Sequence, residues 1–288
     1  MSHAIDRHYS LRITPVRPED WDVFLDWCTA ESWIISEPER YLLQNQWHAC
    51  FKILWEQEHR RAFISVVRYP SSAWIGNLIV DPLRRGCGYG SRLFNAELDL
   101  LKSADIQRIW LTASAMGEPL YRKHGFIGIE TCERWIGAGT GACPGNPVPA
   151  QARGLQRIIT RDAAAWGESR QELLEYLGSI SSVVVNPQFA TLVQPGIHSW
   201  HIGPWIGKSS CGDGAADITA AGDFIAQIRK TAPGGKALSA DVLKSSQLAP
   251  YLEQAGFCKT GTSALMCRTS RHVDLDRVYA LASLGSIG

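Results

Sequence analysis

The chain has 288 residues, of which 45% are hydrophobic and 20% are charged, and its formal net charge is +1. This length suits one large domain or two ordinary ones, and the composition is typical of a soluble globular protein with a sizeable core. The balanced charge lacks the basic excess that marks most nucleic-acid-binding proteins, so we expect no nucleic acid among the partners.

The opening residues, MSHAIDRHYSLRITP, contain no apolar stretch like that of a signal peptide, and no later run is long enough to cross a membrane. The eight cysteines are scattered and form no CxxC pair, which argues against both a disulfide framework and a zinc site. We therefore expect a cytoplasmic protein with no membrane partner and no bound metal.

Strands and helices alternate through the first half of the chain. Runs of β-branched and aromatic residues predict strands at residues 12–16, 62–69, 74–80, 108–114 and 126–137. Apolar spacing and start signals predict helices after Pro18, from near Pro38, after Gly90 and over residues 118–124. The apolar stripe of the second of these helices consists of Leu43, Trp47, Cys50, Phe51 and Leu54.

Composition changes at residues 137–154, GAGTGACPGNPVPAQARG, which are Gly, Pro and Ala with almost no charge. We interpret this segment as a linker between a first domain, residues 1–136, and a second domain, residues 155–288. In the second domain we predict helices near residues 168–177, 219–229 and 248–255. Strands are predicted at SVVV, ATLV, SWHIGPWIG, residues 236–243 and a closing segment that ends in ALMCR.

The two halves repeat three short strings in the same order. WIGNLIV in the first half matches WHIGPWIG in the second, LYRKHGF matches YLEQAGF, and CGYG at residues 87–90 matches CGDG at residues 211–214. Such self-similarity predicts a duplicated α/β unit.

The string LRRGCGYGSRL, residues 83–93, forms the corner between the predicted strand 74–80 and the helix that follows. The first turn of a helix exposes backbone N–H groups without intrahelical partners, and glycines let a ligand approach them closely. Together with the helix dipole and an arginine, these groups suit a phosphate or diphosphate. The string lacks the Lys-Ser/Thr of a P-loop and the GxGxxG spacing of a dinucleotide fold.

With its surroundings, this corner resembles the acyl-coenzyme A motif of the GNAT acetyltransferases. In VDPLRRGCGYGSRL, Arg85, Gly88 and Gly90 occupy the family's three motif positions, and LYRKHGF resembles its second hallmark, with Tyr121 four residues before Gly125. The second half resembles tandem GNAT proteins with a degenerate C-terminal domain, through DAAAWGESR, HIGP, AGF and VYALASLG. The resemblance implies an α/β fold built on a mixed sheet, in two tandem GNAT-like domains.

The resemblance also implies the site residues and the co-substrate, acetyl-CoA. The strand before the corner would lie beside the pantetheine arm, with a backbone N–H near Leu78 or Ile79 at the thioester carbonyl. The full set expected to bind the coenzyme is Leu78, Ile79, Val80, Arg85, Gly86, Cys87, Gly88, Tyr89, Gly90 and Ser91.

Direct acetyl transfer to an amine needs a base, an oxyanion donor and an acid, because an alkylamine has a pKa near ~10 and the thiolate leaves as an anion. Tyr121 is the candidate acid. Glu31, in the segment AESW that resembles a Glu-Gly-Trp segment of the tandem group, is the first candidate base. Glu118, which is near Tyr121 in sequence, or a chain of waters could replace it.

The two halves differ where this chemistry would occur. Leu252 stands four residues before Gly256, where Tyr121 stands before Gly125, and Asp213 would bring a negative charge towards a phosphate. We therefore assign the coenzyme to the first half and expect the second half to shape or cover the acceptor site. Small molecules and peptides both fit as acceptors.

Two other functions fit parts of the pattern. A non-catalytic acyl-CoA-binding sensor would need Arg85, Gly88 and Gly90 but not Tyr121. Aminoacyl transfer would need a tRNA site, for which the sequence offers no basic run. The presence of both Arg85 and Tyr121 favours an enzyme.

Overall fold

The computed structural model describes residues 10–33, 35–141, 152–196, 199–208, 217–269, 273–285 and 287–288. The first half of the chain contains β1 (Leu11–Pro15), α1 (Trp21–Ala30), α2 (Glu37–Tyr41), β2 (Phe51–Glu56), β3 (His59–Arg68), β4 (Ser72–Val80), α3 (Tyr89–Ser103), β5 (Arg108–Ala113), α4 (Glu118–Lys123) and β6 (Ile127–Ala138). The second half contains α5 (Ala152–Trp166), α6 (Gln171–Ile180), β7 (Ser182–Val185), β8 (Phe189–Gln194), β9 (Ser199–Gly207), α7 (Ala221–Thr231), β10 (Ala237–Leu243), α8 (Ala249–Gln254), β11 (Cys258–Arg268) and β12 (Val278–Ala280).

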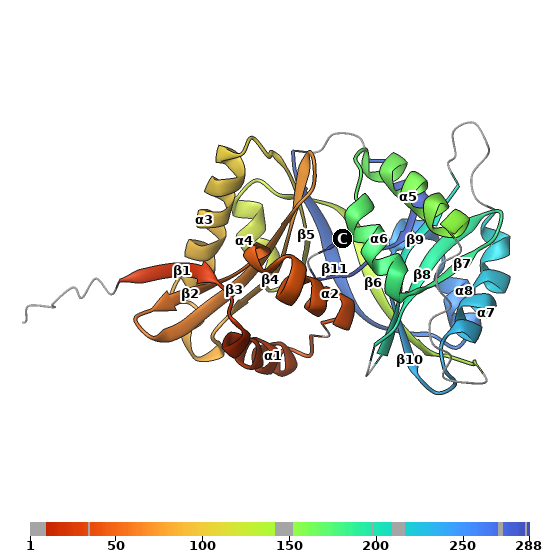
Figure 1. The fold of residues 1–288 in the computed structure, drawn as a ribbon, viewed down its shortest axis with the longest axis horizontal. Coiled ribbons are helices and arrows are strands. Elements are labelled where there is room, and N and C mark those ends of the chain that lie inside the picture. The colour runs from red at the N-terminus through yellow and green to blue at the C-terminus, as the bar shows by residue number, and fades with distance from the viewer. Residues whose placement is uncertain are drawn as a thin grey trace, which may run out of the picture.

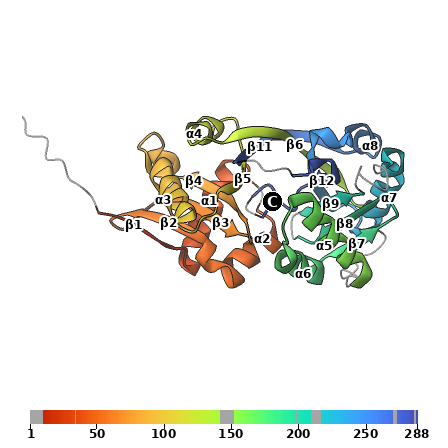
Figure 2. The same ribbon diagram turned by 90° about the horizontal axis from the view of Figure 1, so that it is seen from above.

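The two halves exchange their last long strands. The described strands form one sheet in the order β1-β2-β3-β4-β5-β11-β6-β10-β12-β9-β8-β7. Strand β11 of the second half therefore lies between β5 and β6, and β6 of the first half lies between β11 and β10, all in antiparallel pairs. Figure 1 shows the exchanged strands crossing the middle of the molecule, and Figure 2 shows α4 and α8 at opposite ends of this pair.

The predicted repeat of LYRKHGF and YLEQAGF is visible in the backbone. Gly125 and Gly256 both have φ of 82° at the end of their short helices. The following Phe126 N–H donates to Tyr121 O at 3.2 Å, and Phe257 N–H donates to Leu252 O at 2.9 Å. Tyr121 and Leu252 therefore occupy equivalent positions. The third matched string, at residues 211–214, lies outside the described residues.

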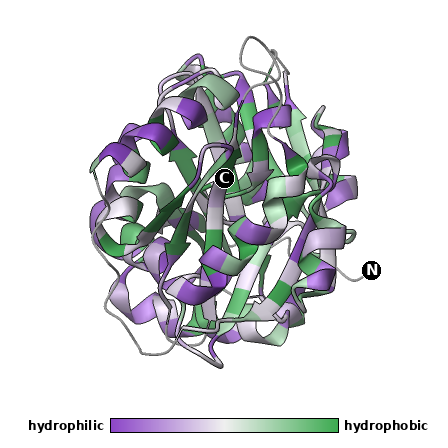
Figure 3. Cartoon of the chain, turned by 90° about the vertical axis from the view of Figure 1, so that its right-hand side faces the viewer, coloured by the Kyte–Doolittle hydropathy of each residue, from purple (hydrophilic) through white to green (hydrophobic). Residues whose placement is uncertain are grey.

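Helices cover both faces of the sheet around separate cores. On one face, α1 packs with α5 and α6 through residues that include Phe24, Ile158 and Leu174. On the other face, α3 and α4 cover the first half, and α7 and α8 cover the second half. Figure 3 shows the hydrophobic residues gathered on the strands and the hydrophilic ones along the outer sides of the helices. No helix in the described ranges is long and apolar enough to cross a membrane.

The prediction of a long second helix from Pro38 to about Leu54 is wrong. Helix α2 does begin near Pro38, but it is short: a π-helical turn over Leu42–Gln46 and a 3₁₀ turn over His48–Cys50 follow it, and β2 begins at Phe51. Phe51 packs beside α1, whereas Leu54 packs beneath α3 on the opposite face of the sheet. Their spacing resembles a helical stripe only because both faces of this strand are buried.

The predicted linker, residues 137–154, is shorter than its composition indicates. Strand β6 continues to Ala138, and α5, which the sequence did not predict, begins at Ala152. Residues 142–151 lie outside the described part of the chain. The division into residues 1–136 and 155–288 remains a proposal about the chain, since the sheet itself is continuous across it.

The segment after β12 returns to the middle of the molecule and is held there by Arg170. Its guanidinium donates to both carboxylate oxygens of Asp162, at 2.6 and 2.9 Å, and to the carbonyl oxygens of Ile287 and Gly288, at 3.1 and 2.9 Å. The side chains of Arg170 and Asp162 are 3% and 0% exposed. Removing one partner would leave the other as an unpaired buried charge.

We predict that Arg170→Met lowers the free energy of unfolding by about 3–5 kcal/mol, because the Asp162 carboxylate loses its buried partner. Arg122→Met is the matched control, since Arg122 pairs with Glu118 while 57% exposed. The control should cost less than about 1 kcal/mol. Urea denaturation of both variants measures the difference, and equal stabilities would contradict the structural role of Arg170.

Candidate active site

Strands β4 and β5 separate along their length and open one edge of β4. Their parallel pairing extends only from Ser72 opposite Arg108 to Trp74 opposite Trp110. On the other edge of β4, Gly76 pairs with Ser65 and Ile79 pairs with Phe63. The two residues between, 77 and 78, face a single residue of β3, which is a β-bulge. The bulge therefore turns the end of β4 towards the opening between β4 and β5.

Asn77 forms the bulge and is held by a buried polar network. Its φ is 52°, in the left-handed region that asparagine adopts more readily than most residues. Its Nδ2 donates to Glu39 Oε1 at 3.1 Å and to Ser65 Oγ at 3.2 Å. Ser283 Oγ donates to the other oxygen of Glu39 at 2.5 Å. The bulge is thus connected to the segment that follows β12.

The glycine corner between β4 and α3 is exposed, and its glycines serve two different purposes. Gly86 and Gly88 have φ of 79° and 84°, which residues with a Cβ rarely adopt. Gly90 allows close packing, because a Cβ there would lie 3.0 Å from Val80 Cγ2. Helix α3 therefore starts directly against the end of β4.

The backbone N–H groups of this corner are available for a ligand. Along α3, the first backbone N–H group with an acceptor in the protein is that of Arg92, which donates to Gly88 O at 3.0 Å. Five others have no hydrogen-bond acceptor among the described residues: Gly86, Gly88, Tyr89, Gly90 and Ser91. An anion fits such a group of donors at the start of a 15-residue helix.

Three side chains at the corner have partners of their own or are exposed. Arg85 Nη2 donates to Glu31 Oε1 at 2.5 Å, so two predicted site residues meet. Tyr89 O–H donates to Glu56 Oε1 at 2.7 Å, which lowers the pKa of Glu56 and, with burial, raises that of Tyr89. Cys87 is exposed. The backbone of the corner, rather than these side chains, offers the unpartnered donors.

Tyr121 lies across the opening from β4. Its ring packs against Phe94 and Phe126, with centroid distances of 5.2 and 6.2 Å, and the residue is 8% exposed. Gly117 leaves room for it, since a Cβ there would lie 3.2 Å from a ring carbon. Burial raises the pKa of the phenol well above its usual value. The hydroxyl therefore stays protonated at neutral pH.

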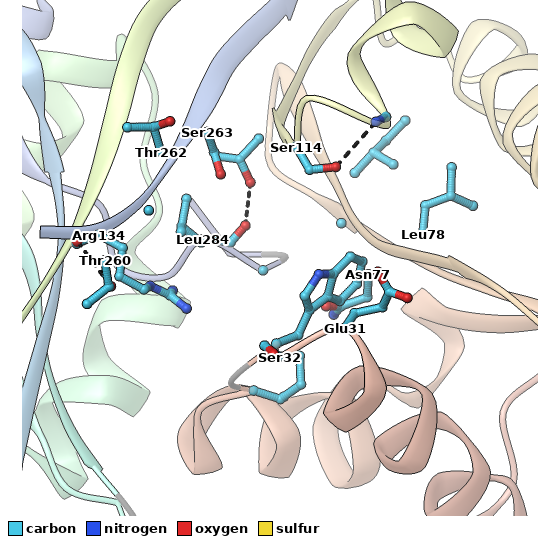
Figure 4. Close-up of a pocket in the computed structure, with 18 of the residues that line it drawn as sticks. Glu31, Ser32, Asn77, Leu78, Ser114, Arg134, Thr260, Thr262, Ser263 and Leu284 are labelled. Carbon is cyan, nitrogen blue, oxygen red and sulfur yellow. Dashed lines mark hydrogen bonds between the residues drawn. The ribbon is translucent and has the colours of Figure 1, made fainter. Parts of the chain in front are cut away.

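A cavity of about 530 Å³ joins these elements. The first half lines it with the loop after α1, the opened edge of β4 and the residues from β5 to α4: Glu31, Ser32, Trp33, Ile35, Ile75, Gly76, Asn77, Leu78, Thr112, Ser114, Gly117 and Tyr121. Exchanged strands and the segment after β12 line the rest: Arg134, Ile136, Thr260, Gly261, Thr262, Ser263, Leu284 and Gly285. Figure 4 shows Glu31 and Leu78 at one end and Arg134 and Thr260 at the other.

The end of the cavity that β11 and β6 form is rich in hydroxyl groups. The charged residue that lines this end, Arg134, is paired with Asp241. Arg134 Nε and Nη2 each donate to a different oxygen of Asp241 at 2.8 Å, and Asp241 is fully buried. Leu284 N–H donates to the same carboxylate at 3.2 Å, and Thr112 Oγ1 donates to Leu284 O at 2.5 Å. These bonds fix the wall opposite β4.

The second half has no corresponding opening among its described strands, because β12 fills it. Strand β12 pairs with β10 on one side and with β9 on the other. Two glycines of β9 make this possible. A Cβ at Gly203 would collide with the carbonyl oxygen of Leu281, and one at Gly207 would collide with the ring of Tyr279.

The other residues singled out from the sequence lie apart from the cavity or outside the described chain. Glu118 pairs with Arg122 at 2.5 Å and does not line the cavity. The side chain of Ile79 is buried in the core beside α1, and Val80 packs beneath α3. Asp213 lies outside the described residues. No group of three His, Cys, Asp or Glu side chains in the described ranges could hold a metal ion.

Sequence reasoning missed Asn77, Arg134 and the β11 wall. The string KTGTSA, residues 259–264, carries a signal that was available, because its hydroxyl residues follow the AGF string at the point where a strand is expected. What the sequence does not reveal is that this strand crosses into the first half.

Comparison with known proteins agrees with this geometry. Residues 17–126 match the Acetyltransferase (GNAT) family. Among curated proteins, holothin acyltransferase from Pseudoalteromonas sp. (strain SANK 73390) is 25% identical over 174 residues. The match covers 59% of this chain and 58% of that relative, so the chain spans little more than half of the relative's length.

Solved structures share the fold over nearly the whole chain. A Pyrococcus horikoshii protein described as an acetyltransferase has a TM-score of 0.76 at 15% identity, covering 99% of each chain. A GCN5-related N-acetyltransferase from Sphaerobacter thermophilus has a TM-score of 0.62 at 12% identity, covering 92% of this chain and 98% of that one. Residues 17–126 of this chain therefore match the GNAT family of acetyltransferases, and the chain shares its fold with these solved structures along nearly its whole length.

Proposed function

We propose that this protein is an N-acetyltransferase that moves an acetyl group from acetyl-CoA directly to an amine of a small molecule or peptide. One observation carries the proposal. The opened edge of β4 lines the same cavity as the Tyr121 ring, and the strand leads from there to the unpartnered N–H groups at the start of α3. Acyl transfer is also the reaction that the name of the curated relative states.

The coenzyme would bind along β4. Its diphosphate would accept hydrogen bonds from the N–H groups of residues 86–91, where the guanidinium of Arg85 supplies a forked donor. The pantetheine arm would follow residues 75–80, whose edge has no partner in β5. The thioester would then reach the bulge at Asn77 and Leu78. The filled opening between β9 and β10 supports one coenzyme site, in the first half.

The reaction needs one bond to form and one to break. The neutral amine attacks the thioester carbonyl carbon, and its proton passes to Glu31 or to water. A C–N bond forms, the carbonyl oxygen becomes an oxyanion, and a backbone N–H near Leu78 would stabilise it. The C–S bond then breaks, and Tyr121 donates its proton to the leaving thiolate. The products are the amide and coenzyme A.

We predict that Arg85→Ala weakens coenzyme A binding about tenfold, because the diphosphate loses one charge-assisted contact. The matched control is Arg84→Ala, which removes an exposed arginine from the same corner. The control should change the Kd by less than about twofold. Isothermal titration calorimetry with coenzyme A measures both variants. Equal Kd values for Arg85→Ala and wild type would count against the diphosphate contact.

We predict that Tyr121→Phe lowers kcat by about 100-fold or more, which is the usual contribution of a general acid. The KM for acetyl-CoA should stay within about twofold, since the phenyl ring keeps the packing against Phe94. A thiol-release assay across an amine panel measures the effect. Full turnover in the variant would remove Tyr121 as the acid. Coenzyme binding without thiol release for any amine would favour the acyl-CoA sensor.

The pH dependence follows from the raised pKa of Tyr121. A general acid acts only while it is protonated. A phenol with its ordinary pKa of about 10 would be deprotonated in half of the molecules at about pH 10. Because burial moves this pKa upward, we predict that kcat does not fall between about pH 8 and pH 10. A pH–rate profile at saturating amine checks this. A decline in kcat with a midpoint below about pH 10 would contradict it.

A further inference from the structure

We infer that the acceptor is a small amine with an apolar body and no carboxylate, bound with its amino group at Glu31. The inference rests on the proposed function and adds the substrate class. It is drawn from the charges of the cavity, which the proposed reaction leaves unassigned.

The cavity has two charged side chains among the described residues that line it, Glu31 and Arg134. They lie towards opposite ends, with Glu31 near Leu78 and Arg134 near Thr260 (Figure 4). The net charge of the site therefore depends on how each of the two is paired.

Arg134 adds no net positive charge to the site. Asp241 accepts two hydrogen bonds from its guanidinium, both 2.8 Å long, and is 0% exposed. A buried carboxylate held in this way is costly to leave unpaired, so the pair stays together. Arg134 can still donate a hydrogen bond to a neutral group, but its charge is matched and does not recruit a carboxylate.

Glu31 loses its partner when the coenzyme binds. In the structure Arg85 pairs with Glu31, and their side chains are 36% and 22% exposed. The diphosphate competes for the same guanidinium with more negative charge and with oxygens that suit its forked donors. Once Arg85 turns towards the phosphate, the Glu31 carboxylate is left without a cation. The loaded site is then negative at its amine end, where it attracts an ammonium ion and repels a second carboxylate.

The remainder of the wall suits an apolar body. Trp33, Ile136 and Leu284 supply the apolar surface, and the hydroxyl groups of β11 supply neutral polar contacts. A cavity of about 530 Å³ is in the range of small-molecule sites. An arylethylamine combines these properties, and the amino acid with the same ring adds only the excluded carboxylate.

Tryptamine and tryptophan are the matched probes. With acetyl-CoA and the full-length protein, we expect kcat/KM from thiol release to be at least about tenfold higher for tryptamine. Calorimetric binding of each probe to the protein loaded with coenzyme A should show the same order. Equal values, or a preference for tryptophan, would overturn the inference and make Arg134 the carboxylate site. If no amine releases thiol, the proposed function fails, and the binding comparison still decides whether the site excludes a carboxylate.

Two variants test the inference through different residues. Thr262→Arg places a guanidinium on the exposed wall of β11, and it should lower the ratio of kcat/KM for tryptamine to kcat/KM for tryptophan at least threefold. Thr262→Met, which adds a long side chain without a charge, should leave this ratio unchanged. Glu31→Gln should bind coenzyme A a few-fold more tightly than wild type, since Arg85 no longer has to leave a carboxylate. An unchanged affinity of Glu31→Gln for coenzyme A would contradict the inference that Arg85 leaves Glu31 when the coenzyme binds. If Thr262→Arg does not fold, the wild-type probes and Glu31→Gln still decide between the two outcomes.

Discussion

The pairing of β11 with β5 and β6 is the constraint on which the rest of the structure depends. In this position a strand of the second half completes the sheet of the first, from Ala264 opposite Ala113 to Arg268 opposite Ile109. Residues 260–263 in the wall of the cavity that faces β4 therefore lie more than 140 positions beyond β4 in the sequence. Neither half encloses the cavity alone. The second half thus helps to shape the cavity of the first half.

A second constraint connects this wall to the bulge in β4. The Glu39 carboxylate is 1% exposed and accepts from Asn77 on one side and Ser283 on the other. Gly285 passes so close that a Cβ there would collide with this carboxylate. Buried polar networks are stable only when their members are satisfied together. The left-handed backbone at Asn77 and the path of the C-terminal segment are therefore held by the same side chain.

The sequence predicts the parts of the site that depend on local structure. The glycine corner and Tyr121 are fixed by turns and helix starts within a few residues, so their roles in the fold could be read from short strings. Phe51 and Leu54 were misassigned to a helix because a strand buried on both faces lacks the alternation that separates it from a helix. The placement of Arg134 and Thr260 beside the first half could not be predicted, for a different reason. Their place depends on which strand pairs with which, and the exchange leaves no local pattern.

The filling of the second opening leaves the described strands with one opening of this kind, between β4 and β5. A separation between β9 and β10 equivalent to that between β4 and β5 would expose backbone groups and apolar side chains if nothing occupied it. Strand β12 covers them by pairing with both neighbours, and the buried Leu252 occupies the position equivalent to that of Tyr121. The same segment then continues to Leu284 and Gly285 in the wall of the first opening. One stretch of chain therefore closes the space between β9 and β10 and also shapes the cavity beside β4.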